Sequence, residues 1–276
     1  MAAVTGSIEG APRRIAVDGA TSRAVARSWW DSEADAYQRE HEDLLGQAQW
    51  LWGPEGWTDD DLDLLRVLQG ERVLELGCGA GAGARWLIER GVRAVGLDVS
   101  HRMLQHSRRI DETEGARVPV VQATAEVLPF RSGTFDVVAT SYGALPFVAE
   151  VDRVFEEVER VLVAGGRAVV AVTHPIRWAF LDDPGPGGLT AVRPYFDRMP
   201  YAEVDRRGDV SYVEHHRTIG DWIEVVVGAG LVIDQLVEPP WNPQNLRTWG
   251  GWSPLRGSLI PGTLILVAHK PPVQPV

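Results

Sequence analysis

Short apolar runs and amphipathic stretches follow one another through the middle of the chain. Residues 73–76 and 93–98 are apolar runs of strand length, and each contains a carboxylate near its end. Residues 85–89 and 103–110, which follow them, carry apolar side chains at helical spacing. Short buried strands that alternate with helices are typical of an α/β fold with a mostly parallel sheet.

The regions on either side carry other patterns. Residues 30–37 have apolar side chains at helical spacing and predict a helix before the first strand. Residues 210–214 alternate between apolar and polar side chains, as in a half-buried strand. Residues 218–221 have the spacing of a capping box and predict the start of another helix.

Four alternating glycines lie between the first predicted strand and its helix, at Gly77, Gly79, Gly81 and Gly83. Glycine lets the backbone approach a ligand where a side chain would block it, and the helix N-terminus offers unpaired N–H groups. Glu75 precedes the first glycine, and its carboxylate would repel a pyrophosphate but attract an ammonium or a sulfonium. The loop therefore predicts a site for a nucleotide-like cofactor that carries positive charge.

Asp98 ends the second predicted strand, one strand–helix unit after the glycines. A carboxylate at this place in a nucleotide-binding α/β fold accepts hydrogen bonds from the ribose hydroxyls. Ser100 is expected to cap the helix that follows. These features extend the predicted cofactor site from the glycine loop to the neighbouring strand.

Five segments between about residues 70 and 174 resemble, in the same order, the motifs of the class I S-adenosylmethionine-dependent methyltransferases, in particular the UbiE-like (type 11) small-molecule enzymes. They are E-x-G-x-G-x-G from Glu75, D-x-S-x-x-M-L from Asp98, A-T-A-E-x-L-P-F from Ala123, and residues 134–140 and 158–167. The third segment departs from the family's G-D-A-E-x-L-P-F at Ala123 and Thr124. The family's Asp commonly accepts a hydrogen bond from the adenine amino group, and a Thr hydroxyl can accept one with a shorter reach and no charge.

The resemblance implies a Rossmann-like α/β sheet of seven mostly parallel strands with an antiparallel last strand. Residues 231–238 and 263–268 would be its sixth and seventh strands. It also implies S-adenosylmethionine as the cofactor and S-adenosylhomocysteine as the product. The implied cofactor-binding residues are Glu75, Gly77, Cys78, Gly79, Gly81, Asp98, Val99, Met103, Thr124, Ala125, Glu126, Ser141, Trp30 and Tyr37.

Three zones are expected along the chain. Residues 1–20 are predicted to be disordered, and residues 21–68 to form a tryptophan-rich helical lid over the cofactor. Residues 69–276 would form the methyltransferase domain, with a small strand-containing cap inserted at about 174–217 after the fifth strand. The segment 241–260 is unusually long for a loop without a function.

Composition narrows the class of protein. A formal net charge of −11 and the lack of a long basic run argue against a nucleic-acid partner. We see no apolar stretch of about 20 residues that could span a membrane and no Cys/His cluster with zinc spacing. The single cysteine, Cys78, fits a reducing compartment, so we expect a cytoplasmic protein without a metal. The sequence leaves the oligomeric state open.

The predicted reaction is in-line transfer of a methyl group to the oxygen, nitrogen or carbon of a small-molecule acceptor, mainly by holding the two reactants together. His174 is the candidate general base because it follows the fifth strand at the carboxyl edge of the sheet, although a structural role competes with this interpretation. The candidate acceptor-binding residues are Tyr142, Trp178, His215, His216, Trp249 and Trp252.

Two other functions fit parts of the pattern. A nicotinamide-dependent oxidoreductase would use the frame Gly79, Gly81 and Ala84, in which Ala replaces the last glycine of the dinucleotide motif. It would leave residues 128–130 unexplained. A non-catalytic protein that binds S-adenosylmethionine is the other alternative, since Ala123 and Thr124 depart from the family motif.

Overall fold

The computed structural model describes residues 12–45 and 47–272 of the chain. Seven strands form the main sheet in the order β4-β3-β2-β5-β6-β10-β9. Their bounds are β2 Arg72–Leu76, β3 Arg93–Asp98, β4 Val120–Gln122, β5 Phe135–Thr140, β6 Leu162–Thr173, β9 Val232–Val237 and β10 Thr263–His269. β10 pairs antiparallel with both of its neighbours, whereas β2 to β6 pair in parallel. The predicted fold class is therefore confirmed, including the antiparallel last strand.

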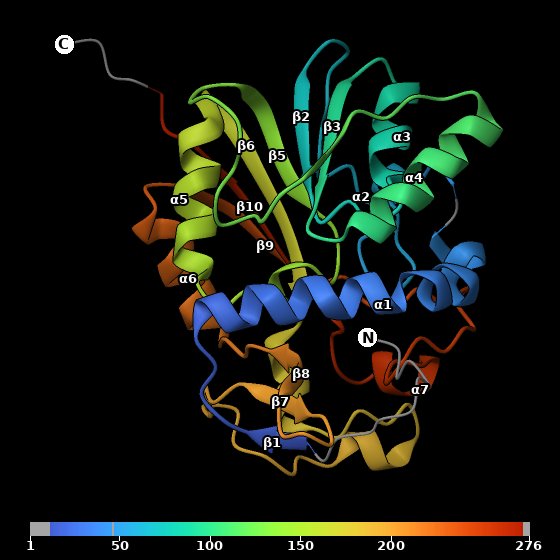
Figure 1. Ribbon diagram of the computed structural model, residues 1–276, viewed down its shortest axis with the longest axis vertical. Helices are drawn as coiled ribbons and strands as arrows, with labels where there is room; N and C mark the ends of the chain where they lie inside the picture. The colour runs from blue at the N-terminus through green and yellow to red at the C-terminus, as the bar shows by residue number, and fades with distance from the viewer. Residues whose placement is uncertain (1–11, 46, 273–276) are drawn as a thin grey trace.

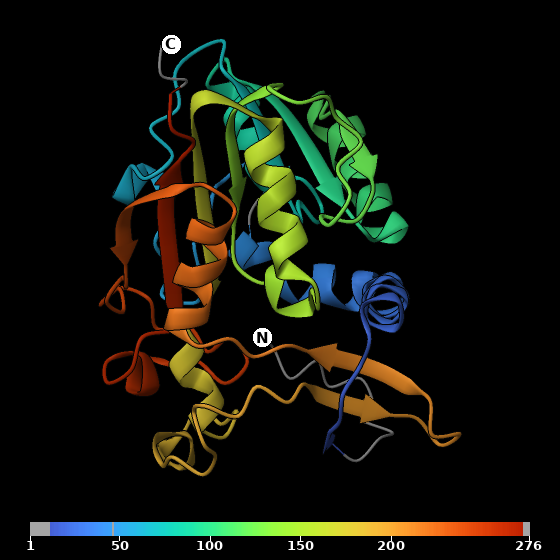
Figure 2. The same cartoon turned by 90° about the vertical axis from the view of Figure 1, so that its left-hand side faces the viewer.

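Apolar side chains cover both faces of this sheet, as the continuous apolar runs of its strands require. Successive strand residues point to opposite faces. Leu74 and Val138 belong to the core on one face, and Val73 and Val137 to the core on the other. Two helices pack on the first face, α5 (Val151–Val161) and α6 (Ile219–Gly228), and α3 (Ala82–Glu89) with residues 50–65 packs on the second. Figure 2 shows α5 and α6 together on one side of the strands.

Local signals account for the helix ends. The Ser100 hydroxyl accepts a hydrogen bond from the Met103 N–H at 3.1 Å and caps α4 (His101–Glu114), as predicted. Thr218 and Asp221 form the predicted capping box at the start of α6. Gly165, with a φ of +77°, lies inside β6, where the pairing with β5 is irregular.

A long helix and a small second sheet complete the fold. α1 (Gly19–Leu45) crosses one end of the main sheet and separates it from a three-stranded sheet of β1 (Pro12–Arg14), β7 (Tyr201–Val204) and β8 (Val210–Glu214) (Figure 1). Five short helical segments lie in the connections of the described chain: α2 (Asp59–Leu62), η1 (Leu145–Phe147), η2 (Pro175–Ala179), η3 (Pro186–Leu189) and α7 (Pro254–Gly257).

Part of the predicted disordered N-terminus is structured. Residues 12–14 form β1, which pairs antiparallel with β7, and α1 begins at Gly19. Residues 1–11 lie outside the described residues. β7 and β8 fall within the predicted cap at 174–217, but β1 completes their sheet, so the N-terminal segment also contributes to this part of the molecule.

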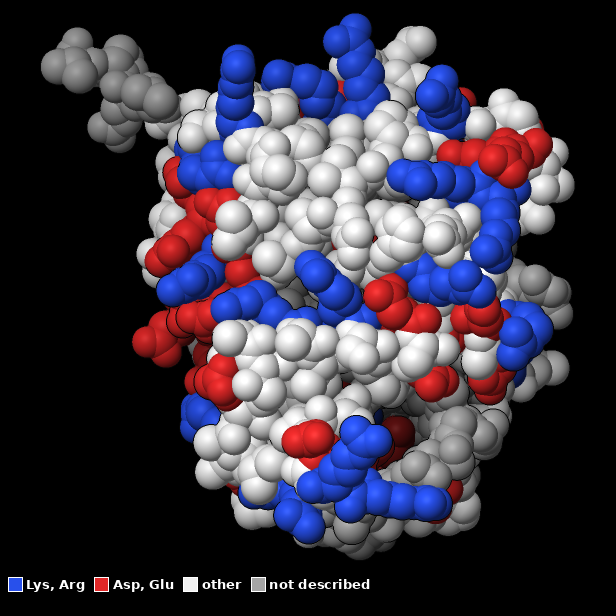
Figure 3. Space-filling view, in the orientation of Figure 1, with Lys and Arg blue, Asp and Glu red and all other residues white. Residues whose placement is uncertain are grey.

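Charge is mixed over the surface that carries α1. Acidic and basic side chains are interspersed on the face shown in Figure 3. Within residues 12–45 and 47–272, no helix is long and apolar enough to span a bilayer.

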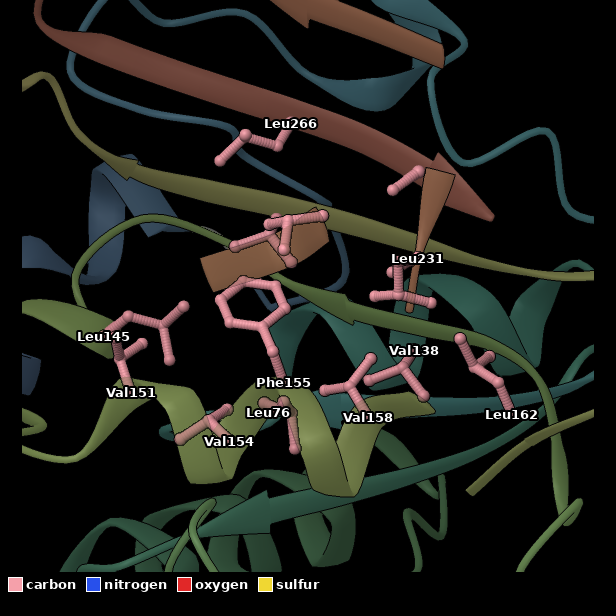
Figure 4. Close-up of a cluster of buried hydrophobic side chains, with 14 of the residues drawn as sticks. Leu76, Val138, Leu145, Val151, Val154, Phe155, Val158, Leu162, Leu231 and Leu266 are labelled. Carbon is pink, nitrogen blue, oxygen red and sulfur yellow. The ribbon is translucent and has the colours of Figure 1, made fainter. Parts of the chain in front are cut away.

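Phe155 offers a test of the core. It is 1% exposed and points from α5 into a cluster of leucine and valine side chains (Figure 4). We expect Phe155→Ala to lower the free energy of unfolding by about 3–5 kcal/mol, because it removes a large buried side chain and leaves a cavity. Leu236→Ala, at a 45% exposed side chain of β9, is the control and should cost less than about 1 kcal/mol. Urea denaturation measures both, and equal losses would contradict this description of the core.

Candidate functional site

The glycine loop lies between the end of β2 and the start of α3. Gly77, Gly79 and Gly81 all have positive φ values, of 67°, 52° and 79°, which favour glycine. A Cβ at Gly77 would collide with Ala144, whereas a Cβ at Gly79 would meet no atom within 4 Å. The open space at Gly79 is therefore room in which a ligand can approach the backbone.

Asp98 holds this loop in place. Its Oδ2 accepts a hydrogen bond from the Gly79 N–H, and its Oδ1 accepts one from the Ser100 N–H, both at 2.8 Å. The side chain is 8% exposed and lines the large cavity described below, and burial raises the pKa of its carboxyl. One carboxylate thus joins the glycine loop to the start of α4 at the edge of the cavity.

The large cavity, with a volume of about 1100 Å³ including its open mouth, lies between α1 and the carboxyl ends of the strands. Many predicted site residues line it: Trp30, Tyr37, Gly77, Gly79, Asp98, Val99, Met103, Thr124, Ala125, Glu126, Tyr142 and Trp249. Its remaining lining includes Arg23, Ala26, Phe147 and Val148. The cavity therefore brings together segments that are up to 226 residues apart, from Arg23 to Trp249.

Thr124, which replaces the family's Asp, is engaged with Glu126. Its hydroxyl donates a hydrogen bond to Glu126 Oε2 at 2.6 Å. Glu126 also pairs with Arg23 of α1 at 3.2 Å, and Arg23 pairs with Glu150 at 2.7 Å. The Thr124 hydroxyl is oriented by Glu126, and the helix above the cavity is tied to the same carboxylate.

A second cavity, with a volume of about 710 Å³ including its open mouth, adjoins the first at the glycine loop. It is lined by Glu75, Cys78 and Ser141 among the predicted cofactor residues, and it shares Tyr37, Gly77, Gly79, Met103, Tyr142 and Trp249 with the large cavity. Glu75 is 4% exposed, and burial raises the pKa of its carboxyl to about 8. Its Oε2 has no hydrogen-bond partner in the described structure.

These features fit S-adenosylmethionine. A buried carboxylate oxygen without a partner suits the ammonium of the cofactor's amino-acid end, because a charge left unpaired in the interior is costly. Asp98 stands at the large cavity, where a ribose would lie, and the backbone at Gly79 is open to a ligand. The residues that hold the group would thus be divided between the two adjoining cavities.

α1 closes over the large cavity through polar contacts with α4. Asp31 accepts hydrogen bonds from the Ser100 hydroxyl at 2.7 Å and the Arg102 N–H at 3.0 Å. Asp35 pairs with Arg102 and His106, both at 2.7 Å. These contacts set α1 so that Trp30 and Tyr37 line the cavity.

Aromatic rings form much of the cavity wall. The ring of Trp30 lies 5.3 Å from that of Tyr37 and 5.4 Å from that of Phe147, and the rings of Tyr142 and Trp249 are 5.5 Å apart. Aromatic faces attract cations, including a sulfonium.

His174 does not line either cavity, and its contacts do not support the predicted role of general base. Its Nδ1 accepts a hydrogen bond from the Ile176 N–H at 3.1 Å, and its Nε2 lies 2.8 Å from Glu238 Oε1. Both ring nitrogens are therefore engaged, and the side chain caps η2. Burial lowers the pKa of His174, although Glu238 acts in the opposite direction.

Other predicted residues line neither cavity. Gly81 is the N-cap of α3, where a Cβ would meet the Ser107 side chain. His215 is hydrogen-bonded to Ser22 at 2.9 Å, and His216 to the Tyr195 carbonyl at 2.6 Å. Trp178 and Trp252 are buried, each against an arginine. Of the predicted acceptor-binding residues, Tyr142 and Trp249 are the two that line a cavity.

Some residues that line the cavities could not be identified from sequence patterns. Arg23 makes its two ion pairs with residues more than 100 positions away, so no local pattern reveals it. Trp50 lines the second cavity and belongs to the tryptophan-rich zone, but nothing in its neighbourhood distinguishes it from Trp52, which is also buried.

Comparison with known proteins agrees with this geometry. The family model described as a methyltransferase domain matches residues 74–170. A demethylmenaquinone methyltransferase of Thermus thermophilus is 34% identical over 160 residues, which cover 57% of this chain and 69% of the relative. In two further relatives, the matched segment spans a smaller share of the relative's length, 59% in one and 49% in the other.

Solved structures show the same fold. An S-adenosylmethionine-dependent methyltransferase from Mesorhizobium loti is 26% identical with a TM-score of 0.59, covering 76% of this chain and 95% of that chain. A Burkholderia thailandensis 1,6-didemethyltoxoflavin-N1-methyltransferase, solved with S-adenosylhomocysteine, has a TM-score of 0.60 and 16% identity and covers 95% of both chains.

The pKa of Glu75 leads to a stability test. The folded protein keeps the carboxyl proton up to about pH 8, whereas the unfolded chain loses it near 4.5, so stability without ligand falls between these values. Arg85 opposes this shift and Asp98 adds to it. Because Gln does not ionise, we expect Glu75→Gln to gain stability over wild type, by more than about 1 kcal/mol at pH 8 and little at pH 5.

Urea denaturation at the two pH values measures this difference, with the exposed Glu112→Gln as control. A gain that is the same at pH 5 and pH 8 would mean that Glu75 ionises as it does in the unfolded chain.

Proposed function

The chain belongs to the class I S-adenosylmethionine-dependent methyltransferases, and we propose that it methylates a small, largely apolar aromatic acceptor bound beneath α1. The observation that carries this proposal is the aromatic wall of the large cavity, which adjoins the residues predicted to bind the cofactor. The nicotinamide alternative is set aside, since the family match covers the glycine loop and residues 128–130 together. A cytoplasmic location stays a prediction.

The cofactor-binding groups are proposed from their positions. Asp98 would accept hydrogen bonds from the ribose, and Thr124, Ala125 and Glu126 would lie along the adenine. Glu75 would pair with the ammonium. When bound, the cofactor supplies a methyl group activated by a positively charged sulfur. The work of the protein is then to hold the acceptor in line with that methyl.

The chemistry of the cavity favours an aromatic acceptor. Trp30, Phe147, Tyr142 and Trp249 offer ring faces and edges for stacking. The charged side chains Arg23 and Glu126 pair with each other, which leaves them less available to a charged acceptor. The name of the Thermus thermophilus relative indicates a quinone-type acceptor for that protein, and a hydroxylated aromatic ring is accordingly the first class to test here.

Tyr142 is the residue we propose to orient the acceptor. Burial raises the pKa of its hydroxyl, so the group stays protonated and can donate to an acceptor oxygen. No histidine lines either cavity within the described structure. Positioning rather than a strong base would therefore carry the reaction.

Replacing Asp98 tests the cofactor site. We expect Asp98→Asn to weaken binding of S-adenosylhomocysteine about tenfold or more, because hydrogen bonds to a charged acceptor are worth about 1.5–3 kcal/mol each. Calorimetry measures the affinity, and Glu112→Gln is the surface control. Unchanged affinity in a folded variant would place the ribose elsewhere.

Replacing Tyr142 tests the acceptor site. In a screen of phenols and quinols, formation of S-adenosylhomocysteine should identify an acceptor. With that acceptor, Tyr142→Phe should lower kcat/KM about tenfold and leave the affinity for S-adenosylhomocysteine unchanged. Tyr201→Phe, whose hydroxyl bonds Glu203 away from both cavities, should leave both unchanged. Methylation of aliphatic acceptors alone would contradict the proposed acceptor class.

A further inference from the structure

The second cavity is lined by side chains with an unusual concentration of unsatisfied polar atoms. Each atom is buried and lacks a hydrogen-bond partner in the described structure, and each belongs to a lining residue: Gln38 Oε1, Trp50 Nε1, Glu75 Oε2 and Trp249 Nε1. A buried polar group without a partner costs about 1–3 kcal/mol. Such atoms gathered around one cavity indicate a polar ligand that satisfies them.

The types of atom define that ligand. Glu75 and Gln38 offer acceptor oxygens, whereas Trp50 and Trp249 offer indole N–H donors. No Lys, Arg or His lines the cavity within the described residues. A simple anion would leave the acceptor oxygens of Glu75 and Gln38 unpaired, and a simple cation would leave the indole N–H groups unpaired. A group with an ammonium beside a carboxylate satisfies both sets.

We propose that the indole N–H groups of Trp50 and Trp249 donate hydrogen bonds to the carboxylate at the amino-acid end of the cofactor, whose ammonium is assigned above to Glu75. The proposal rests on the proposed function, because the amino-acid end of S-adenosylmethionine carries both an ammonium and a carboxylate. It gives the indole N–H of Trp249 a role toward the cofactor, while the ring of Trp249 also lines the large cavity.

The relation between the cavities supports this assignment. They share Gly77, Gly79 and Met103, so one ligand can pass from Asp98 in the large cavity to Glu75 in the second. Glu75 lines the second cavity and not the large one, so such a ligand would reach it through the second cavity.

Both tryptophans are held by segments that contact each other. Trp249 exchanges two backbone hydrogen bonds with Trp252, at 2.9 and 3.0 Å. The loop that carries it is bound to the segment after Trp50, since Asn245 donates to the Pro54 carbonyl at 2.8 Å. The Trp50 carbonyl in turn accepts a hydrogen bond from the Asp59 N–H at 2.9 Å. The two indole groups are therefore positioned before a ligand binds.

Trp50 and Trp249 also lie outside residues 74–170, the segment that matches the methyltransferase model. The proposal thus gives the long loop at 241–260 a role in recognising the carboxylate. It further implies that neutral N–H groups, rather than a cation, bind this carboxylate.

The test compares two ligands and two matched variants. S-adenosylhomocysteine carries the amino-acid group, and 5′-methylthioadenosine carries the same adenosine and thioether without it. Trp249→Phe keeps an aromatic ring and removes the N–H. Trp252→Phe is the control, because its indole N–H is also buried and unpartnered but does not line the cavity.

By calorimetry, we expect Trp249→Phe to weaken S-adenosylhomocysteine about tenfold or more and to leave 5′-methylthioadenosine unchanged. Trp252→Phe should leave the affinity for both ligands unchanged. Equal weakening of both ligands by Trp249→Phe, or no weakening of either, would overturn the proposal. Failure of the wild-type protein to bind either ligand would instead contradict the proposed function.

Nuclear magnetic resonance gives a readout that does not depend on whether the Trp50 variant folds. In the wild-type protein labelled with ¹⁵N, the indole N–H signals of Trp50 and Trp249 should move downfield on addition of S-adenosylhomocysteine, and that of Trp252 should not. Movement of neither cavity signal in a complex that calorimetry shows to be saturated would overturn the assignment.

Discussion

The carboxylate of Asp98 determines how the parts of the site are arranged. One oxygen accepts the Gly79 N–H and the other accepts the Ser100 N–H, which fixes the glycine loop and the start of α4 relative to β3. The Ser100 hydroxyl then donates to Asp31 of α1. Hydrogen bonds to an ionised acceptor are stronger than neutral ones. A single buried group therefore sets the loop, the helix and the covering helix before a ligand binds.

α1 is held by two kinds of contact that have different effects. Ion pairs such as Arg23 with Glu150 and Asp35 with Arg102 are partly exposed and contribute about 0–1 kcal/mol each. Ala34, which is fully buried, and Val25 supply apolar contact along the same helix. Because the ion pairs lie at separate points along α1, a shift along its axis would break all of them. The ion pairs therefore fix the position of α1 along its axis more than they strengthen its packing on the sheet. This position places Trp30 over the cavity.

The sequence allowed the sheet and the cofactor edge to be predicted, because strand periodicity, the glycine loop and Asp98 are local patterns. β1 could not be predicted, since residues 12–14 form a strand only through pairing with β7, almost 190 positions away. His174 was placed at the correct edge of the sheet, but topology does not determine which way a side chain points. Its neighbours Ile176 and Glu238 occupy both ring nitrogens. Arg23, like β1, could not be predicted, because its partners are distant in sequence.

The burial of Glu75 destabilises the free protein, and the two cavities offer a reason for it. Burial of Glu75 opposes its ionisation, which lowers the stability of the free protein at neutral pH. A ligand that pairs with it binds the folded state alone and restores that stability. Asp98 lines the large cavity and Glu75 the second, and the two cavities share Gly77, Gly79 and Met103. A ligand held by both carboxylates would cross this shared wall beside Tyr37, Tyr142 and Trp249. It would then present its reactive group to the aromatic side of the large cavity.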